Sequence, residues 1–268
     1  MVSGDGTRMG ELQEQTAAGM ARHAVITGGG TGIGAAIARS LAKDGNRVTL
    51  IGRRSAPIAS VAEELSGFAH AADVTDRSSV DAAFKAARAA HGPIGILVNC
   101  AGNAPSSKFA STSLEQWRAT MAVNLDALFN CIQAGIADLL AATAGRIVTI
   151  SSTAGLKGYA YVAPYVAAKH GAIGLTRALA AEFASTALTV NAVCPGFTDT
   201  DLVTRAVTNI AALTGRDEQA ARTELAHYNP QRRLIAPEEV AAAVSWLCRL
   251  DSQSITGQAI AVAGGEVT

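Results

Sequence analysis

Short apolar runs alternate along this chain with longer helical patterns, and this alternation limits the possible folds more than any other feature of the sequence. The strand-like runs cover residues 23–27, 47–51, 68–72, 94–99, 146–151, 188–193 and 258–262. The helical patterns cover residues 32–44, 56–66, 78–90, 113–141, 164–185 and 236–249. Because the apolar runs lack regular polar alternation, they are typical of strands that are buried on both faces of a parallel sheet.

This order of elements predicts a doubly wound α/β domain, in which a seven-stranded parallel sheet has helices on both faces. Ser78, Ser113 and Pro237 mark the starts of three helices. Residues 200–235 interrupt the alternation with two short helical pieces. We expect these pieces to form a small helical lid over the substrate, since an insertion there lies beyond the carboxyl ends of the strands, where open α/β sheets bind ligands.

No linker and no internal repeat divides the sequence, so we expect a single domain over residues 21–268. Residues 1–20 are polar and contain glycine, and they lack the apolar core of a signal peptide. We therefore expect a mobile tail in that region, ahead of the first strand.

Composition argues against several classes of function. The 22 lysines and arginines balance 22 aspartates and glutamates, which disfavours nucleic acid or a membrane surface as a partner. No apolar run approaches the roughly 20 residues that would span a bilayer. The four cysteines lie far apart, as expected of free thiols in a reducing compartment, and the five histidines form no ligand set. We expect a cytoplasmic protein with no metal site.

A glycine-rich turn, "VITGGGTGIGAAIA", follows the first strand-like run and opens a helical pattern. Glycines allow such a turn to bend sharply and to approach a pyrophosphate closely, while the free N–H groups of the helix start face the phosphates. A turn with a purely structural role is the alternative. As a dinucleotide site, the turn would use Gly28, Gly30, Thr31, Gly32, Ile33 and Gly34.

Tyr165 and Lys169 are four residues apart, so on a helix they share one face. A free tyrosine has a pKa of about 10, and a nearby ammonium favours the phenolate. We therefore expect a lowered pKa and a tyrosine that acts as general acid toward a ketone or as general base toward an alcohol. The alternative is that both side chains simply lie on an exposed polar face of the helix. Tyr159 and Tyr161 are rivals for this role, but neither has a lysine four residues further on.

Six motifs follow one another in a recognisable order. They are "TGGGTGIG", Asp73, "NCAG" at 99–102, Asn124, Ser152 with Tyr165-x-x-x-Lys169, and "PGFTDT" at 195–200. Over about residues 21 to 263 the chain resembles the short-chain dehydrogenase/reductase family of the classical type. The resemblance implies a Rossmann domain and an NAD(P)(H)-dependent oxidoreductase, which transfers hydride between nicotinamide and a ketone or a secondary alcohol.

The same resemblance implies roles for single residues. Ser152, thirteen residues before the tyrosine (165 − 152 = 13), would hydrogen-bond the substrate carbonyl. Lys169 would also hold the nicotinamide ribose, and Asn124 would hold a water that links Lys169 to solvent. The further cofactor contacts would be Asp73, Val74, Asn99, Ala101, Gly102, Tyr165, Pro195, Gly196, Thr198 and Thr200. Cys100 and Ala263 depart from the family's usual residues, an asparagine and an aspartate.

In this family, the residues that follow the second strand indicate whether the cofactor is NAD(H) or NADP(H). Gly52 stands where members that prefer NAD carry an acid, and Arg53 and Arg54 follow it. An arginine can pair with a 2′-phosphate, and no acid is present to repel it. This favours NADP(H) as the cofactor, and NAD(H) is the alternative. The other interpretation of the two arginines is that they form a solvated basic turn with no role in binding.

Local similarity indicates the class of substrate. "APYVAAKHG" and "TVNAVCPGF" resemble reductases of 3-oxoacyl thioesters, ketoreductases of aromatic polyketides and 3-hydroxyacyl-CoA dehydrogenases. We expect a 3-oxoacyl or 3-hydroxyacyl thioester; a polyketide, cyclic alcohol, steroid or sugar is the alternative, and a dinucleotide-sensing regulator is the non-enzyme alternative. One or more of five arginines in the expected lid would meet the phosphate of a CoA or carrier-protein arm: Arg205, Arg216, Arg222, Arg232 and Arg233. The resemblance also implies a homotetramer, assembled through residues 113–141 and 164–185.

Overall fold

The computed structural model describes residues 21–215 and 217–267; the tail expected at residues 1–20 lies outside the described residues. Seven strands form one sheet in the order β3-β2-β1-β4-β5-β6-β7, and every neighbouring pair is parallel. The strands are β1 (His23–Thr27), β2 (Arg47–Gly52), β3 (Phe68–Ala71), β4 (Ile94–Asn99), β5 (Arg146–Ile150), β6 (Thr189–Pro195) and β7 (Ala259–Val262). The prediction of a seven-stranded parallel sheet is confirmed.

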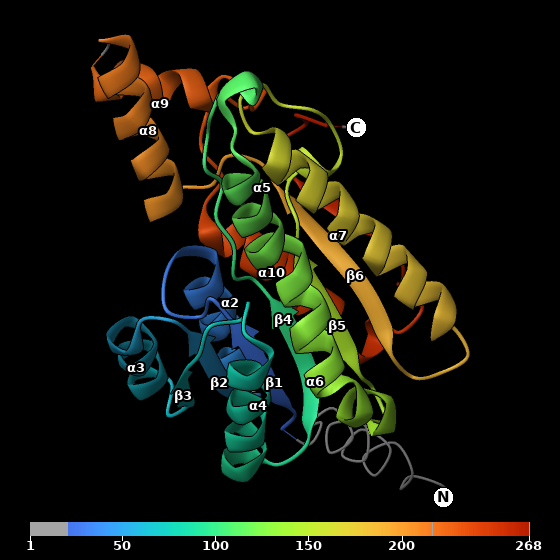
Figure 1. The fold of residues 1–268 in the computed structure, drawn as a ribbon. Helices are drawn as coiled ribbons and strands as arrows, with labels where there is room; N and C mark the ends of the chain where they lie inside the picture. Colours follow the sequence, from blue (N-terminus) through green and yellow to red (C-terminus); the bar gives the residue numbers. More distant parts are fainter. Residues whose placement is uncertain (1–20, 216, 268) are drawn as a thin grey trace, which may run out of the picture.

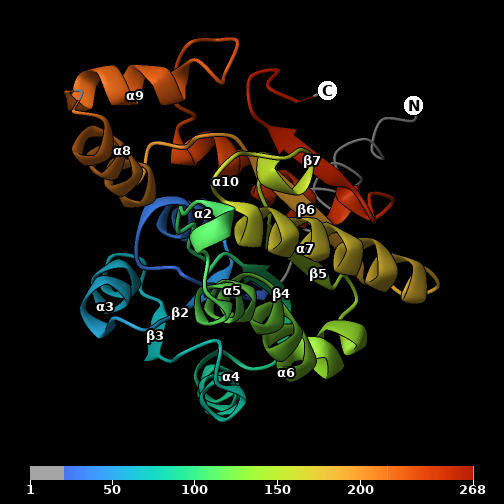
Figure 2. The ribbon, with the colours of Figure 1, turned by 45° about the horizontal axis from the view of Figure 1, so that its top comes forward.

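Helices cover both faces of the sheet, as Figures 1 and 2 show. They are α2 (Gly32–Lys43), α3 (Ser55–Glu64), α4 (Arg77–His91), α5 (Leu114–Met121), α6 (Ala127–Ala141), α7 (Ala163–Glu182) and α10 (Pro237–Cys248). Short 3₁₀ turns lie at Phe109–Ser111, Thr153–Gly155 and Leu250–Ser252. Within the described residues, no helix is both long and apolar enough to cross a membrane.

Each face of the sheet has its own apolar core. On one face, Ile37 and Leu41 of α2 and Val244 of α10 pack with sheet residues such as Ile26. On the other face, α4, α6 and α7 enclose a second core, which includes the buried ring of Phe84. Burial on both faces explains why the strands read as continuous apolar runs.

The strand order reverses between β1 and β4, and the loops that leave these two strands are joined. Thr27 Oγ1, at the end of β1, accepts the backbone N–H groups of Cys100 at 3.0 Å and Ala101 at 3.2 Å. Open α/β sheets bind ligands in the crevice at such a switch point, outside the carboxyl ends of the strands. The fold therefore indicates a ligand site at this edge of the sheet.

Helix starts follow the capping rules, with one correction. Ser113 caps α5, since its Oγ accepts the N–H of Gln116 at 3.1 Å while Gln116 Oε1 accepts the N–H of Ser113 at 3.2 Å. The predicted start at Ser78 is wrong by a small margin: α4 begins at Arg77 and its cap is Asp76. The Asp76 carboxylate accepts both the N–H and the hydroxyl of Ser78 at 2.9 and 2.8 Å, so it is the better acceptor there.

The predicted continuous helix over 113–141 is interrupted. Between α5 and α6 the backbone forms a π-helical segment, Ala122–Asp126, and Asn124 at its centre is fully buried. Such segments add one residue to a turn and are frequent at functional sites. The interruption carries no Gly or Pro signal, so helical periodicity alone gives no indication of it.

The segment expected as a lid contains two helices, α8 (Asp201–Thr214) and α9 (Glu218–Ala226). They share a small apolar core of their own, made by Val203, Val207, Ala221 and Leu225, against which Phe197 packs. In Figures 1 and 2 these two helices project from the domain beyond the carboxyl ends of the strands. Phe197, in the turn after β6, and Leu234, in the loop before α10, join this small core to the domain.

Candidate active site

The glycine turn leads directly into α2, whose amino terminus is left open for an anion. Thr31 is the N-cap in an extended conformation; within the described residues its side chain makes no capping hydrogen bond, and the first turn contains no acid. The first N–H groups of a helix have no partner within the helix, and they lie at the positive end of its dipole. This end of α2, with Gly32, Ile33 and Gly34 in its first turn, fits a phosphate group.

The glycines of the turn are needed for close packing of the chain itself. A Cβ on Gly34 would lie 2.2 Å from the carbonyl oxygen of Gly28, and one on Gly28 would lie 3.0 Å from the N of Ala101. Gly28 also has a φ of +68° and Gly32 a φ of +51°, conformations that favour glycine. The same residues thus bring the backbone of the first turn against the loop after β4. Such a close approach of two backbone segments fits the turn of a dinucleotide site.

Tyr165, Ser152 and Lys169 meet at the start of α7. Lys169 Nζ lies 5.5 Å from the centre of the Tyr165 ring and donates to the carbonyl oxygen of Ile150 at 2.9 Å. The Tyr165 hydroxyl is hydrogen-bonded to the Ser152 side chain, and Ser152 Oγ also accepts the N–H of Ala154 at 3.1 Å. The structure thus brings the expected hydroxyl, phenol and ammonium together at the end of β5.

The expected lowering of the tyrosine pKa is wrong for the protein by itself. Burial raises the pKa of Tyr165 to about 12, although the hydrogen bond with Ser152 acts in the opposite direction. Burial also lowers the pKa of Lys169 to about 8. Desolvation disfavours the charged form of each group, and it is the largest cause of both shifts. The phenol is therefore protonated at neutral pH, which suits proton donation to a carbonyl oxygen.

Asn124 lies beside the lysine because of the π-helical segment. Its Nδ2 donates to the carbonyl oxygens of Asn103 and Thr120, both at 3.0 Å. Its Oδ1 is buried and has no partner among the described residues. A Cβ on Gly102 would lie 2.8 Å from this oxygen and 3.7 Å from Lys169 Nζ. An unpaired acceptor next to the ammonium fits a bound water or a ribose hydroxyl.

The turn after β6 is rigid. The Thr198 hydroxyl donates to the carbonyl oxygen of Gly196 at 3.0 Å, and the Thr200 hydroxyl donates to that of Thr198 at 3.2 Å. Thr198 also pairs with Ile235, in the loop before α10. The turn therefore presents its backbone in one fixed shape at the carboxyl end of β6, directly after Pro195.

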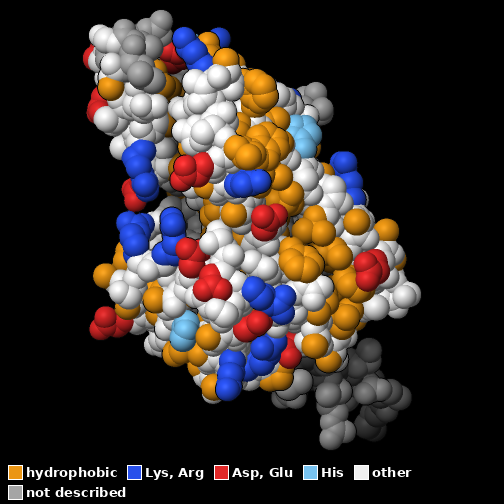
Figure 3. Space-filling view, in the orientation of Figure 1, with side chains coloured by type: hydrophobic (Ala, Val, Ile, Leu, Met, Phe, Trp, Pro, Cys, Tyr) orange, Lys and Arg blue, Asp and Glu red, His pale blue; other side chains and the backbone are white. Residues whose placement is uncertain are grey.

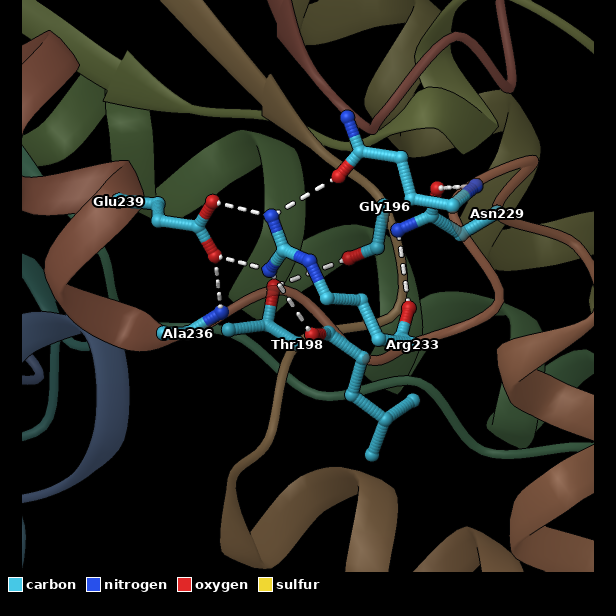
Figure 4. A network of polar contacts seen from close by, with 8 residues as sticks. Gly196, Thr198, Asn229, Arg233, Ala236 and Glu239 are labelled. Carbon is cyan, nitrogen blue, oxygen red and sulfur yellow. Dashed lines mark hydrogen bonds and ion pairs between the residues drawn. The ribbon is translucent and has the colours of Figure 1, made fainter.

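A network of polar contacts lies beside this turn (Figure 4). Arg233 donates to both carboxylate oxygens of Glu239, at 2.5 and 2.7 Å. Glu239 also accepts the N–H of Ala236 at 2.7 Å, and Asn229 Nδ2 donates to the Arg233 carbonyl oxygen at 2.9 Å. The guanidinium lowers the pKa of the Glu239 carboxyl to about 2. This network fixes the loop that leads into α10.

The other expected cofactor residues lie along the same edge of the sheet. Asn99 ends β4, and both polar atoms of its side chain are buried without a partner among the described residues. Asp73 follows β3 and accepts the N–H and hydroxyl of Thr75 at 2.9 and 2.8 Å, contacts that lower its pKa. Val74 is buried beside it. The unpaired amide of Asn99 and the open start of α2 together fit a bound dinucleotide.

Arg53 and Arg54 follow β2 and are both exposed. Arg54 is the N-cap of α3, and neither guanidinium has an ion-pair partner among the contacts of the described residues. Figure 3 shows Lys and Arg side chains at the rim of a hollow between α8 and the body of the domain. Two exposed cations next to the turn of Gly52 fit an added phosphate.

Most of the arginines in the lid form ion pairs or hydrogen bonds within the protein. Arg222 pairs with Asp199 at 2.6 Å, Arg233 pairs with Glu239, and Arg205 donates to the Asp201 carbonyl oxygen at 3.2 Å. Arg216 lies outside the described residues. Within the described part of the chain, no group of three or more His, Cys, Asp or Glu side chains could hold a metal ion.

Sequence reasoning missed two features of this region. One is the π-helical segment at Asn124, which has no local signal. The other is a buried cluster around Glu266, whose carboxylate contacts Tyr159 and Lys157, 107 and 109 positions earlier in the chain. Only the topology could have indicated the second, since the segments after β5 and β7 end at the same edge of the sheet.

Comparison with known proteins agrees with this arrangement. A family model described as short chain dehydrogenase matches residues 22–211. A putative ketoacyl reductase of granaticin polyketide synthase from Streptomyces violaceoruber is 37% identical, over 90% of this chain and 92% of that protein. The D-beta-hydroxybutyrate dehydrogenase of Rhizobium meliloti (strain 1021) is 36% identical, over 92% of this chain and 98% of that protein.

A solved structure is also similar throughout. A variant of actinorhodin polyketide ketoreductase, determined with NADPH, superposes with a TM-score of 0.89 at 32% identity, and the match covers 92% of this chain and 97% of the other. Strand order, glycine turn and the Ser–Tyr–Lys cluster thus agree with a family match over most of the chain. The chain therefore belongs to the short-chain dehydrogenase family.

Proposed function

We propose that this protein is an NADPH-dependent ketone reductase whose substrate is a 3-oxoacyl thioester or the ketone of a polyketide chain. The observation that carries the proposal is the Ser152–Tyr165–Lys169 cluster, with a protonated phenol beside an ammonium at the ligand-binding edge of the sheet. The names of the relatives support the substrate class, since they include a polyketide ketoacyl reductase and a dehydrogenase of a 3-hydroxy acid.

The proposed chemistry assigns one task to each side chain. The reduced nicotinamide, when bound, supplies the hydride for the carbonyl carbon. Tyr165 donates its proton to the carbonyl oxygen, which Ser152 also hydrogen-bonds. Lys169 holds the ribose and replaces the proton that the phenol has lost. The unpaired Oδ1 of Asn124 holds the water through which Lys169 exchanges protons with solvent.

The cofactor contacts are proposed for the residues along the same edge. The start of α2 would hold the pyrophosphate, Asn99 and the loop after β4 the adenine ribose, and the rigid turn at Gly196 and Thr198 the carboxamide. Arg53 and Arg54 would pair with the 2′-phosphate of NADP(H), because Gly52 leaves no acid beside them. The NADPH in the similar solved structure supports this preference.

Oligomeric state and location complete the proposal. Large apolar side chains are exposed on α5 and α6: Leu114 at 61%, Phe129 at 55% and Leu140 at 39%. Figure 3 shows hydrophobic side chains gathered over α5, α6 and α7. Apolar surface of this kind marks a contact between proteins, and we propose a homotetramer. The four cysteines are free thiols, which supports a reducing compartment such as the cytoplasm.

The test follows NADPH oxidation with acetoacetyl-CoA, acetoacetyl-pantetheine and a panel of cyclic ketones. We expect turnover by the wild-type protein, and about a thousandfold loss in Tyr165→Phe with unchanged NADPH binding by fluorescence titration. Tyr161→Phe is the matched control, because Tyr161 is exposed and has no lysine four residues on. NADPH binding without turnover of any ketone by the wild type would indicate a dinucleotide-sensing regulator instead.

The same panel tests the lid arginines. Equal kcat/KM values for acetoacetyl-CoA and acetoacetyl-pantetheine would show that no arginine meets the CoA phosphates. A clear preference for the CoA ester would leave Arg205, Arg216 and Arg232 as candidates for that contact, since Arg222 and Arg233 already pair with carboxylates.

A further inference from the structure

A buried carboxylate, Glu266, lies in the segment that follows β7, and the proposed chemistry does not use it. Its side chain is 1% exposed. Lys157 Nζ lies 3.2 Å from Oε1, and the Tyr159 hydroxyl is hydrogen-bonded to the same oxygen. Buried carboxylates are costly unless they are paired, and here Oε1 is paired whereas Oε2 has no hydrogen-bond partner among the described residues.

The direction of the hydrogen bonds follows from the chemistry of the groups. The Tyr159 and Thr153 hydroxyl oxygens are 2.7 Å apart. A carboxylate only accepts, so Tyr159 donates its single proton to Glu266, and Thr153 donates to Tyr159. Thr153 directly follows Ser152. A chain of two hydrogen bonds therefore leads from Glu266 to the backbone turn that carries the proposed catalytic serine.

Three aromatic rings gather at the same place. The ring centres of Tyr159, Phe197 and Tyr228 are 5.2 to 6.1 Å apart in all three pairs. Lys157 Nζ lies 5.0 Å from the Tyr159 centre and 6.0 Å from the Tyr228 centre, within cation–π range of both. The rings come from three segments, which follow β5, β6 and α9. We call these three rings the aromatic wall.

The segment with Glu266 also packs closely on two of these three segments. A Cβ on Gly264, whose φ is +60°, would lie 2.1 Å from Oδ1 of the buried Asn229, next to Tyr228. A Cβ on Gly196, next to Phe197, would lie 2.8 Å from Glu266 Oε2. Both glycines thus permit a close approach that brings the carboxylate between the turn after β6 and the end of the lid.

We propose that Glu266 is a positioning residue that determines substrate specificity through the aromatic wall. It fixes Tyr159 by a hydrogen bond and Tyr228 through the Lys157 ammonium, so that the Tyr159 ring stands next to Thr153, in the turn that carries Ser152. A planar ring system on the substrate stacks on this wall, whereas a short acyclic 3-oxoacyl chain has no face to stack. Of the two proposed substrate classes, the protein then prefers a polyketide ketone that bears a ring over an acyclic 3-oxoacyl thioester. This inference rests on the proposed ketone reductase function.

The test compares two substrates in steady-state kinetics with NADPH: the bicyclic ketone β-tetralone and the acyclic acetoacetyl-N-acetylcysteamine. In Glu266→Ala we expect the KM for β-tetralone to rise about tenfold, with kcat and the KM of the acyclic thioester within about twofold. In Glu266→Gln we expect a rise of about threefold, because the amide oxygen still accepts from Tyr159. Val267→Ala, at the next position, is the control and leaves both KM values unchanged.

Three results would overturn the proposal. An equal rise in both KM values, or no rise, overturns the specificity role even though the reductase function stands. A wild-type protein that reduces neither substrate overturns the proposed function and this inference with it. If Glu266→Ala does not fold, Tyr159→Phe replaces it, because it keeps the ring and removes only its hydrogen bonds. An unchanged KM for β-tetralone in that variant contradicts the proposal.

Discussion

Burial shifts the pKa values of Tyr165 and Lys169 in opposite directions, because it disfavours the charged form of each side chain. Each loses water, so the phenol keeps its proton more firmly while the ammonium releases its proton more readily. At neutral pH the pair is a proton donor beside a cation. A ketone would be reduced from this state. Of the two side chains, only Lys169 changes its charge near pH 8, whereas Tyr165 keeps its proton there.

A pH profile of ketone reduction tests this. Because the pKa of Lys169 is lowered to about 8, kcat/KM should be level from pH 6 to about 7.5 and should fall as the lysine loses its proton at higher pH. In Lys169→Arg, which stays charged, the remaining activity should show no fall in that range. A wild-type profile that stays level to pH 9 would contradict the assignment.

The exposed pair Arg53 and Arg54 gives a prediction about the cofactor. Replacing both by alanine removes the cations proposed for the 2′-phosphate, so the KM for NADPH should rise at least about tenfold. The KM for NADH should stay within about twofold, because NADH lacks that phosphate. Arg77→Ala, an exposed arginine that pairs with Asp81 on α4, is the control. Equal changes for both cofactors would remove the preference for NADP(H).

Among the elements, two glycines in helices have opposite surroundings. A Cβ on Gly34, in α2, would lie 2.2 Å from the Gly28 carbonyl oxygen, whereas one on Gly174, in α7, would meet nothing within 4 Å. Glycine in a helix interior costs up to about 1 kcal/mol relative to alanine. The same substitution should therefore have opposite effects on stability at the two positions.

Thermal unfolding of the two variants checks this. Gly174→Ala should raise the free energy of unfolding by about 0.5 to 1 kcal/mol. Gly34→Ala should lower it by about 2 kcal/mol or more, because backbone rather than a flexible side chain obstructs the new methyl group. Gly34→Ala should also weaken NADPH binding, since the turn must move. A stabilised Gly34→Ala would show that the turn is more open than the structure indicates.

For the molecule as a whole, one source of acid sensitivity lies at the end of the sheet away from the site. His23, at the start of β1, is buried; Nδ1 is 2.8 Å from the Gly92 carbonyl oxygen and Nε2 is 2.8 Å from Thr49 Oγ1. Both contacts are satisfied by a neutral ring that donates from Nδ1 and accepts at Nε2. Burial is the main reason that the pKa of His23 is lowered to about 4.

The sign of the pH effect follows from that shift. His23 takes up a proton near pH 6.5 in the unfolded chain and only near pH 4 in the folded protein, so its contribution to stability is complete above pH 6.5 and is lost as the pH falls from 6.5 to 4. The loss should be on the order of 3 kcal/mol. Denaturant unfolding at pH 7 and pH 4.5 measures it. His23→Gln should reduce the difference, and the exposed His170→Gln should not.

Assembly is the other prediction at this scale. Light scattering on a sizing column should give four times the mass of one chain. Phe129→Glu should reduce that mass, because a charge would be buried against apolar surface. Leu202→Glu, at an exposed apolar position on α8 outside the proposed interface, should leave the mass unchanged. A wild-type protein that elutes as a monomer would end the proposal.

The sequence by itself was sufficient for the sheet, the order of the helices and the class of reaction. The sheet and the helices depend on local signals, namely apolar runs and the glycines from Gly28 to Gly34, whereas the class of reaction is what the resemblance of the six motifs implies. Each signal acts over a few residues, so a linear pattern carries it completely. The six motifs in order then identified the family, although the placement of single cofactor contacts remains a prediction.

Only the tertiary structure decided how the site behaves. The pKa of Tyr165 rises rather than falls because atoms from distant segments exclude water from it, and spacing along α7 cannot report that. Asn124 lies beside Lys169 through a π-helical segment without a local signal. Glu266 reaches Tyr159 across 107 positions because parallel strands bring their carboxyl ends to one edge. Burial and long-range contacts arise only when the chain packs. They determine the pKa values and the neighbours of the site residues, whereas local patterns already determine the strands and helices.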